Sequence, residues 1–363
     1  MKKIPVGVLG ATGSVGQRFV SLIARHPWFE IGALTASERS AGRPYGEAVR
    51  WMQEEPLPDE VAALEVLPTA PPLPCRLLFS ALDSKTADRA EVELARAGHF
   101  VVSNAKSHRM DPDVPLMVPE VNPNHLELLS AQDFGGEGAI VTNPNCSTIG
   151  LVLALKPLYD TFGLEQVHVV TLQALSGAGV PGVPSLAAVD NVVPFIPGEE
   201  DKVETEPCKI LGRYSQGAIE GADLRISAQC TRVAVIDGHT ECVSVKLRRR
   251  ASLEELKEAL SSWRSVPQEM DLPSAPPQPV LVSEREDRPQ PRLDRGHGQG
   301  MAATVGRLRP CPLFDYKFVV LSHNTLRGAA GGSLLVAELA LAQGRIPGLS
   351  IPSASEAPVM AQG

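Results

Sequence analysis

Short apolar runs alternate with helical stretches along the first part of the chain. The runs IPVGVLG, FEIGALTAS, RLLFSAL, HFVVSNA and GAIVTN have the length and composition of buried strands. Between them, SVGQRFVSLIARHP and TADRAEVELARAG carry apolar residues at helical spacing, and Pro27 ends the first of these helices. Strands that alternate with helices predict an α/β domain with a doubly wound parallel sheet, which we place at residues 1–147.

The pattern changes in the second half, where the strands become longer and partly alternate between apolar and polar positions. These segments are VHVVTLQAL, LRISAQCTRVAVI, TECVSVKLRRR and FDYKFVVLS. The pair Asp237 and Gly238 is typical of a tight turn, so we expect a β-hairpin between the second and third of them. We therefore predict a second α+β domain with a largely antiparallel sheet at residues 148–325.

Two segments near the C-terminus differ from these strands. The stretch from Pro273 to Gly300 is rich in proline and charge, and we expect it to be the least ordered part, a surface excursion. The segment GSLLVAELALAQG has the pattern of an amphipathic helix. No internal repeat is apparent.

Length and charge narrow the function classes. A chain of 363 residues is too long for one compact core and suits two domains. Its formal net charge of -8, with both signs mixed, gives no electrostatic reason to bind nucleic acid or a membrane surface. No apolar run is long enough to cross a bilayer, and glycine and proline break what a signal peptide would need as its apolar core. We expect a cytoplasmic protein that acts on a small molecule.

The cysteines do not form a recognisable framework. They are scattered, without C-x-x-C spacing or nearby histidines: Cys75, Cys146, Cys208, Cys230, Cys242 and Cys311. Neither a disulfide framework nor a zinc site is therefore indicated, and we expect no metal.

The run GATGSVG lies where the first strand passes into the first helix. Glycines let the backbone turn tightly and approach a pyrophosphate, whose charge the helix N-terminus stabilises. The spacing is G-x-x-G-x-x-G, and a purely structural turn would need the same residues, but the strand-loop-helix context favours nucleotide binding in a Rossmann-type domain. The candidate cofactor residues are Gly10, Thr12, Gly13, Ser14, Val15 and Gly16.

The end of the second strand bears on the choice between NAD and NADP. A carboxylate there would pair with the ribose hydroxyls and repel an added phosphate. The sequence TASERSAG has no acid before Glu38 and clusters Ser37, Arg39 and Ser40, which suit a 2′-phosphate. NADP is favoured over NAD, with a solvated loop as the alternative.

Cys146 in TNPNCSTIG lies between an Asn-Pro-Asn turn and an apolar run, Ile149 to Leu155, that predicts a helix. The unpaired N–H groups of a helix N-terminus would favour a thiolate, which makes Cys146 a candidate nucleophile; a small buried apolar residue is the alternative. A nicotinamide fold with such a cysteine suggests thioester chemistry coupled to hydride transfer. His239, two residues after Asp237, is the best candidate for the acid/base, although a hydrogen-bonded turn residue has the same pattern.

At this point the chain resembles a known family. The motifs GATGSVGQ, SNAKSHRM, NPNCST, LQALSGAG, EEDKVETEPCKIL, TRVAVIDGH and HNTLRGAAGG are similar, in this order, to those of aspartate-β-semialdehyde dehydrogenase, in the branch found in archaea and fungi. The resemblance covers residue 1 to about residue 350. It implies reversible, NADP-dependent reduction of L-aspartyl-4-phosphate to L-aspartate-4-semialdehyde and inorganic phosphate. It also implies that a last segment, about 326–363, returns to the first domain, and that the second domain forms a homodimer or homotetramer.

The resemblance assigns roles to individual residues. Cys146 is implied as nucleophile, His239 as acid/base, Gln173 as a residue that holds the acyl intermediate, and Asn145 as part of the oxyanion site. Arg232 matches the cation that grips the substrate carboxylate. For the rest of the substrate it implies Arg109 and Lys202 at the phosphate and Glu200 at the amine, and for the nicotinamide Ser176, Gly177 and Asn324. Without the resemblance, GEEDKVETE would be interpreted as a solvated charge run.

Three alternatives stay open. A malonyl-CoA reductase of the same fold would share the cysteine, the histidine and the NADP loop, but would have less use for Arg109, Glu200 and Lys202. N-acetylglutamyl-phosphate reductase has a different cysteine motif. A catalytically silent NADP-binding regulator with Cys146 as a redox sensor is the alternative from outside the enzymes.

Overall fold

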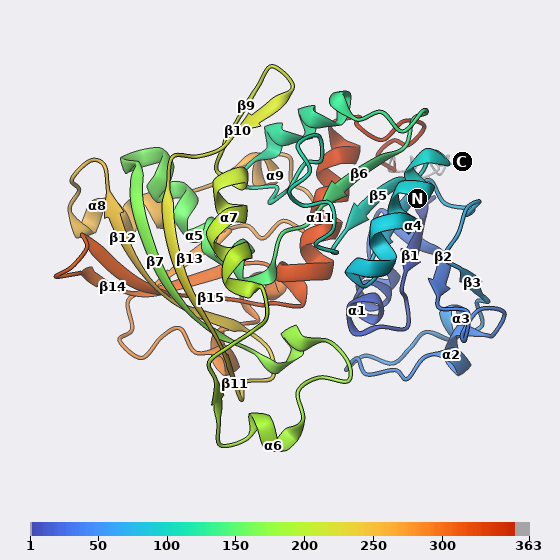
Figure 1. The fold of residues 1–363 in the computed structure, drawn as a ribbon, viewed down its shortest axis with the longest axis horizontal. Coiled ribbons are helices and arrows are strands. Elements are labelled where there is room, and N and C mark those ends of the chain that lie inside the picture. Colours follow the sequence, from blue (N-terminus) through green and yellow to red (C-terminus); the bar gives the residue numbers. More distant parts are fainter. Residues whose placement is uncertain (1, 353–363) are drawn as a thin grey trace, which may run out of the picture.

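Two large β-sheets, each with its own helices, form the bulk of the described structure (Figure 1). The computed structural model describes residues 2–352. The predicted domains include residue 1 and residues 353–363, which lie outside the described residues, so the domain bounds stay a prediction. The α/β class itself is confirmed, because one sheet is parallel and the other is mixed and mostly antiparallel.

The first sheet has the strand order β3-β2-β1-β4-β5-β6, and every neighbouring pair is parallel. Its strands are β1 (Ile4–Leu9), β2 (Phe29–Ala36), β3 (Val66–Pro68), β4 (Leu77–Ser80), β5 (Phe100–Ser103) and β6 (Ala139–Thr142). The helices of this part are α1 (Ser14–Ala24), α2 (Tyr45–Ala48), α3 (Asp59–Ala62), α4 (Ser84–Arg96) and the 3-10 helix η1 (Pro123–Ala131). The order reverses beside β1, as a doubly wound sheet requires.

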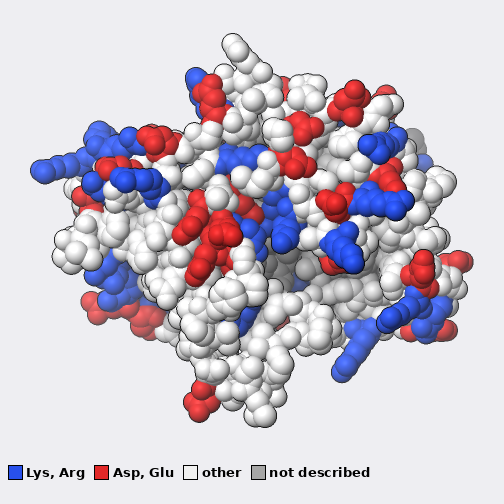
Figure 2. Space-filling view, viewed as in Figure 1, with Lys and Arg blue, Asp and Glu red and all other residues white. Residues whose placement is uncertain are grey.

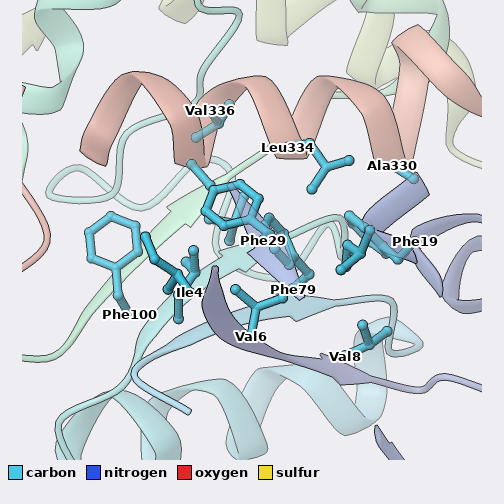
Figure 3. Packing of buried hydrophobic residues seen from close by; sticks show 14 of the residues in the cluster. Ile4, Val6, Val8, Phe19, Phe29, Phe79, Phe100, Ala330, Leu334 and Val336 are labelled. Carbon is cyan, nitrogen blue, oxygen red and sulfur yellow. The ribbon is translucent and has the colours of Figure 1, made fainter. Parts of the chain in front are cut away.

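Apolar side chains fill both faces of this sheet. On one face the rings of Phe19 and Phe79 stack with centroids 5.1 Å apart, and Phe29 packs edge-on to Phe79. Leu334 and Val336 of the last helix, α11 (Gly331–Ala342), belong to the same cluster (Figure 3). Helix α4 contributes to the apolar cluster on the other face. The C-terminal helix therefore packs against the first sheet.

The second sheet has the order β13-β14-β15-β12-β7-β11-β8. Its strands are β7 (Leu164–Gln173), β8 (Val192–Val193), β11 (Arg225–Val233), β12 (His239–Leu247), β13 (Val280–Ser283), β14 (Ala303–Pro310) and β15 (Tyr316–Ser322). Helices α5 (Cys146–Phe162), α7 (Glu199–Ile210) and α8 (Leu253–Ser261) share an apolar cluster with it. The remaining elements are η2 (Leu175–Ala178), α6 (Ser185–Ala188), the pair β9 (Arg213–Ser215) and β10 (Ala218–Glu220), α9 (Val266–Glu269), α10 (Pro291–Asp294), η3 (His297–Gly300) and the π-helix η4 (Leu326–Ala330).

The predicted hairpin at Asp237 and Gly238 is wrong. Strand β7 lies between β11 and β12, parallel to the first and antiparallel to the second. Gly238 does adopt a positive φ of 100°, so the chain bends where the residues suggest, but it crosses over β7 before it continues. Turn residues show where a chain bends and not which strand fills the space between its two arms.

Two further expectations need correction. The stretch from Pro273 to Gly300 is ordered, because β13 within it pairs with β14 and Asp294 is buried in an ion pair with Arg288. Helix α11 is buried on all sides rather than amphipathic, since every residue from Gly331 to Leu341 is buried. It lies between the two sheets (Figure 1), so no face is left for solvent.

Candidate active site

A cleft of about 500 Å³ opens between the two sheets. Residues of the first part that line it include Ser14, Val15, Asn104 and Arg109, and residues of the second include Cys146, Ser176, Gly177, Lys202 and Asn324. This face of the molecule is hollowed between the two halves, with Lys and Arg side chains at the edge of the hollow (Figure 2). Nine of the predicted site residues, from both halves of the molecule, thus line one cleft.

Cys146 begins helix α5, and Asn145 caps this helix. The Asn145 side-chain oxygen accepts hydrogen bonds from the backbone N–H groups of Ser147 (2.9 Å) and Thr148 (3.2 Å). The cap explains why the helix starts here, because it satisfies two of the donors that a helix N-terminus leaves free. The Asn145 side chain therefore competes with the sulfur for these donors.

The thiol is held against His239, the first residue of β12. The Cys146 Sγ and His239 Nε2 atoms lie 3.1 Å apart. The other ring nitrogen, Nδ1, accepts a hydrogen bond of 3.0 Å from the backbone N–H of Ala174. A neutral imidazole that accepts at Nδ1 carries its proton on Nε2. Burial lowers the pKa of His239 to about 3, so the ring is neutral and directs its Nε2–H at the sulfur.

The expectation of a favoured thiolate is wrong for this state of the protein. Burial, together with the Glu199 carboxylate, raises the pKa of the Cys146 thiol to about 12. Lys202 and Arg109 act in the opposite direction, but they do not outweigh the loss of solvent. The position at a helix start is as expected, and its electrostatic effect is overridden by burial and by the Glu199 carboxylate.

Of the two neighbouring acids, Glu199 and not Glu200 has its carboxylate turned towards the residues around Cys146. The Glu199 carboxylate accepts from Asn145 Nδ2 (2.7 Å) and Gln173 Nε2 (3.1 Å), and it pairs with Lys202. Burial raises the pKa of Glu199, but Lys202 and these hydrogen bonds outweigh burial and hold it below its ordinary value. The Glu200 carboxylate instead accepts from the backbone N–H of Cys230. Neighbouring residues point about 100° apart on a helix, so only one of the two can face Cys146.

The charge run on α7 is therefore largely inside the protein. Glu206 is buried, and its carboxylate accepts from Arg109 (2.9 Å) and from the backbone N–H of Asn145 (2.7 Å). Lys209 is also buried and donates to three backbone carbonyls. Through Glu206 the run fixes Arg109, a cation of the cleft, beside Asn145, which caps helix α5.

Strands β7, β11 and β12 bring the other predicted residues together. Gln173 and Arg232 are opposite each other in the parallel ladder of β7 and β11, and Arg232 donates to the Ala174 carbonyl at 2.7 Å. A Cβ atom on Gly177 would lie 2.9 Å from Arg232 Nη1 and 3.0 Å from His239 Cε1. The absence of a side chain on Gly177 therefore lets Arg232 and His239 both approach the same point of this loop, although the hairpin does not form.

The glycine loop borders a second cavity, of about 510 Å³. Its lining includes Gly10, Thr12, Gly13, Ser37 and Glu38, and Leu82 and Asp83 line both this cavity and the cleft. Gly10 has a φ of 72°, and a Cβ on Gly16 would meet the Gly10 carbonyl. The chain fits a dinucleotide here, because the loop exposes backbone at a helix start. Arg39 is exposed and Ser40 half-buried on the loop that follows Glu38.

Asn324 also lines the cleft, and its side chain links its own segment to those that carry Ser176 and Gly238. Its amide donates to Ser176 Oγ and its oxygen accepts from the Gly238 backbone N–H, both at 2.8 Å. Four residues on, in η4, a Cβ on Gly328 would lie 2.7 Å from the Cys146 Cβ. The segment after β15 therefore packs directly against Cys146.

Two family descriptions match the chain. Residues 5–129 match the semialdehyde dehydrogenase NAD binding domain, and residues 155–327 match the semialdehyde dehydrogenase dimerisation domain. The aspartate-semialdehyde dehydrogenase of Archaeoglobus fulgidus is 54% identical over 337 residues, which cover 92% of this chain and 97% of that protein. The chain belongs to the aspartate-semialdehyde dehydrogenase family. It is accordingly an oxidoreductase of aspartate-family amino-acid biosynthesis.

Solved structures agree with this membership. The aspartate-semialdehyde dehydrogenase from Candida albicans, determined with NADP, has a TM-score of 0.87 and 44% identity, covering 93% of this chain and 98% of that one. Aspartate-semialdehyde dehydrogenase II from Vibrio cholerae, complexed with ASA, has a TM-score of 0.73 and 25% identity, covering 94% and 98%. This chain thus has an NAD(P)-binding domain and a dimerisation domain.

For a member of this family, sequence reasoning missed several cleft residues. Glu199, Glu206 and Gly328 were not singled out. The three-residue spacing of Glu199 and Lys202 could have shown that these two share a helix face. No local signal marks Gly328, because its contact with Cys146 joins residues far apart in the chain.

In this aspartate-semialdehyde dehydrogenase, replacing Glu199 with glutamine should make the Cys146 thiol more reactive. Removing a negative charge beside an acid lowers that acid's pKa, and Lys202 would lose its ion-pair partner and reinforce the effect. In the Glu199→Gln variant, the increase of the iodoacetamide alkylation rate with pH should begin about one pH unit lower than in the parent protein. Glu200→Gln is the matched control and should leave the profile in place. A shift of equal size in both variants would contradict the assignment.

Among residues 2–352, no helix is both long and apolar enough to cross a membrane, and no group of three or more His, Cys, Asp or Glu side chains could hold a metal ion.

Proposed function

We propose that the chain catalyses the reversible, NADP-dependent conversion of L-aspartyl-4-phosphate into L-aspartate-4-semialdehyde and phosphate through a thioester on Cys146. The observation that carries this proposal is the 3.1 Å contact of Cys146 Sγ with His239 Nε2, in a cleft that continues into the glycine-loop cavity. A nucleophile, a proton donor and a dinucleotide site in one cleft are the groups that acyl reduction needs.

The substrate's charges fit the cleft. We assign its α-carboxylate to Arg232, whose guanidinium can donate two parallel hydrogen bonds. Arg109 and Lys202 line the cleft on the side of Cys146 and are assigned to the phosphate. Glu199, which is buried and held ionised, replaces Glu200 as the group for the α-amine. Gln173, bonded to Glu199, is assigned to the acyl intermediate.

In the first step, Cys146 Sγ attacks the acyl carbon and the bond from this carbon to the phosphate oxygen breaks. The thiol proton leaves with the phosphate, which departs as hydrogen phosphate, so His239 need not accept it. Transfer of the thiol proton to the phosphate agrees with a neutral His239 whose Nδ1 already accepts the Ala174 N–H. In the reverse direction, hydrogen phosphate attacks the thioester and returns its proton to the sulfur.

When bound, the nicotinamide cofactor supplies the hydride that reduces the thioester. The Nε2–H of His239 then donates to the oxygen that gains negative charge, and the sulfur leaves as a thiolate. This thiolate takes a proton from solvent to restore the starting state. Burial lowers the pKa of His239 and so keeps the ring neutral, with a single proton, between turnovers.

We infer a preference for NADP from the Ser37–Ser40 loop. Glu38 also lines the cavity, and a carboxylate at this point would favour the ribose hydroxyls of NAD, which is the competing assignment. Arg39→Ala is expected to weaken NADP binding about ten-fold and NAD binding less than two-fold, because only NADP offers a phosphate to the guanidinium. Fluorescence titration of both cofactors measures this. Arg43→Ala, in the same loop, is the control, and equal losses for both cofactors would overturn the preference.

The assay that tests the reaction follows absorbance of NADPH with purified protein, NADP, phosphate and L-aspartate-4-semialdehyde, beside a reaction without phosphate. A parallel reaction contains NADPH and malonyl-CoA. Phosphate-dependent formation of NADPH is expected. If only the reaction with malonyl-CoA consumes NADPH, the substrate assignment is wrong and the chain is a malonyl-CoA reductase of the same fold. If neither reaction proceeds, a catalytically silent NADP-binding regulator is favoured. The homodimer or homotetramer and the cytoplasmic location stay predictions.

A further inference from the structure

A buried acid that none of these steps uses lies behind the catalytic pair. Glu241 follows His239 by two residues on β12, so both side chains point to the same face of the sheet. This face packs against α5. The Glu241 side chain is only 1% exposed, and burial raises its pKa well above the ordinary value.

Glu241 has no partner to compensate for its burial. Within residues 2–352, neither of its carboxyl oxygens has a hydrogen-bond partner, and the same is true of the hydroxyl of Ser322. Ser322 lies on β15 directly opposite His239 and is also buried. Buried polar atoms in folded proteins are nearly always hydrogen-bonded, so the Glu241 carboxyl group and the Ser322 hydroxyl each need a partner.

The packing of α5 brings these two groups together. Cys146 and Gly150 are one helical turn apart and face the same way. A Cβ atom on Gly150 would lie within 4 Å of both Ser322 Oγ and Glu241 Oε1. The start of α5 therefore meets the sheet at two levels, Cys146 against His239 and Gly150 against Glu241.

A proton relay from Glu241 through His239 does not fit this geometry. The Nδ1 atom of His239 accepts from the Ala174 N–H, and Nε2 faces Cys146 Sγ. Both ring nitrogens are thus engaged by groups other than Glu241. A role for Glu241 must act through the position of the elements.

We propose that Glu241 and Ser322 bind an internal water, and that this water fixes the first turns of α5 against β12 and so holds Cys146 beside His239. An acid O–H, an acid carbonyl and a hydroxyl supply the two to four partners that a buried water needs. Glu241 is then a positioning residue. The inference rests on the proposed roles of Cys146 and His239.

The test compares three variants by thermal unfolding, kcat, KM and the pH profile of Cys146 alkylation. Glu241→Leu removes the carboxyl group from apolar surroundings and leaves only the Ser322 hydroxyl without its partner, so its thermal stability should stay close to that of the parent protein. Its kcat should fall about ten-fold, since small misplacements of reacting groups are costly, and its alkylation profile should shift. Glu241→Gln keeps a donor and an acceptor and should restore most of the kcat.

Val243→Ala is the matched control, because Val243 lies on the same strand and the same face as Glu241, two residues farther from His239. It should lower stability and leave kcat and the alkylation profile unchanged. A parental kcat and profile in Glu241→Leu would overturn the inference, and so would equal changes in Val243→Ala. A crystal structure of the parent protein should show the water between Glu241 and Ser322. That readout does not depend on activity, so the water site can stand even if Cys146 proves dispensable for turnover.

Discussion

Replacing Cys146 with alanine is expected to abolish phosphate-dependent turnover, by at least about 1,000-fold, while NADP binding stays within two-fold of the parent value. Without the sulfur no acyl intermediate can form, and no other thiol lines the cleft in the described part of the chain. The glycine-loop cavity does not include Cys146, so the cofactor should bind as before. Single-turnover kinetics and a cofactor titration measure the two effects.

The control for this variant is Cys242→Ala. Cys242 is an exposed cysteine on β12, three residues after His239, and points away from the catalytic pair because side chains alternate along a strand. Its removal should leave turnover near the parent rate. Phosphate-dependent turnover at the parent rate in Cys146→Ala would end the assignment of the nucleophile.

The second large effect is expected on stability, from Arg327. Its guanidinium donates two hydrogen bonds to the Glu120 carboxylate, at 2.7 and 2.5 Å, and both side chains are almost fully buried. Replacing Arg327 with methionine leaves the Glu120 charge buried and unpaired. We expect the free energy of unfolding to fall by about 3–5 kcal/mol, measured by urea denaturation.

This ion pair also supports the active site. Arg327 belongs to η4, where Gly328 N–H bonds to the His323 carbonyl and Gly328 packs on Cys146. Arg213→Gln, which breaks the exposed pair with Glu220, is the control and should leave unfolding unchanged. If Arg327→Met unfolds at the parent urea concentration, the pair contributes nothing to stability.

Much of the architecture arises from local pattern. The apolar runs that form β1, β2, β4, β5 and β6 alternate with α1 and α4, and this alternation is enough to predict a parallel sheet. Cys146 is found at a helix start because proline and asparagine before it interrupt regular structure and Asn145 caps helix α5. Each of these features depends on residues that are neighbours in sequence.

Only those site residues could be predicted from the sequence that lie in motifs similar to those of the family. They named Cys146, His239 and Arg232, and the structure places all three together. They pointed to Glu200, whereas the structure turns Glu199 towards Asn145 and Gln173. The rotation of α7 about its axis decides between the two acids, and that rotation is set by packing against β11 and α5.

The sequence by itself therefore determined the fold class, the position of the glycine loop, and the cysteine and histidine that we propose as nucleophile and proton donor. The tertiary structure alone decided that β7 separates β11 from β12, that the thiol is protonated at neutral pH, and that Glu241 is buried beneath the catalytic pair. The physical reason is the distance along the chain over which each effect acts. Strand and helix patterns arise between neighbouring residues, whereas burial, charge pairing and proton affinity depend on groups that only the folded chain brings together.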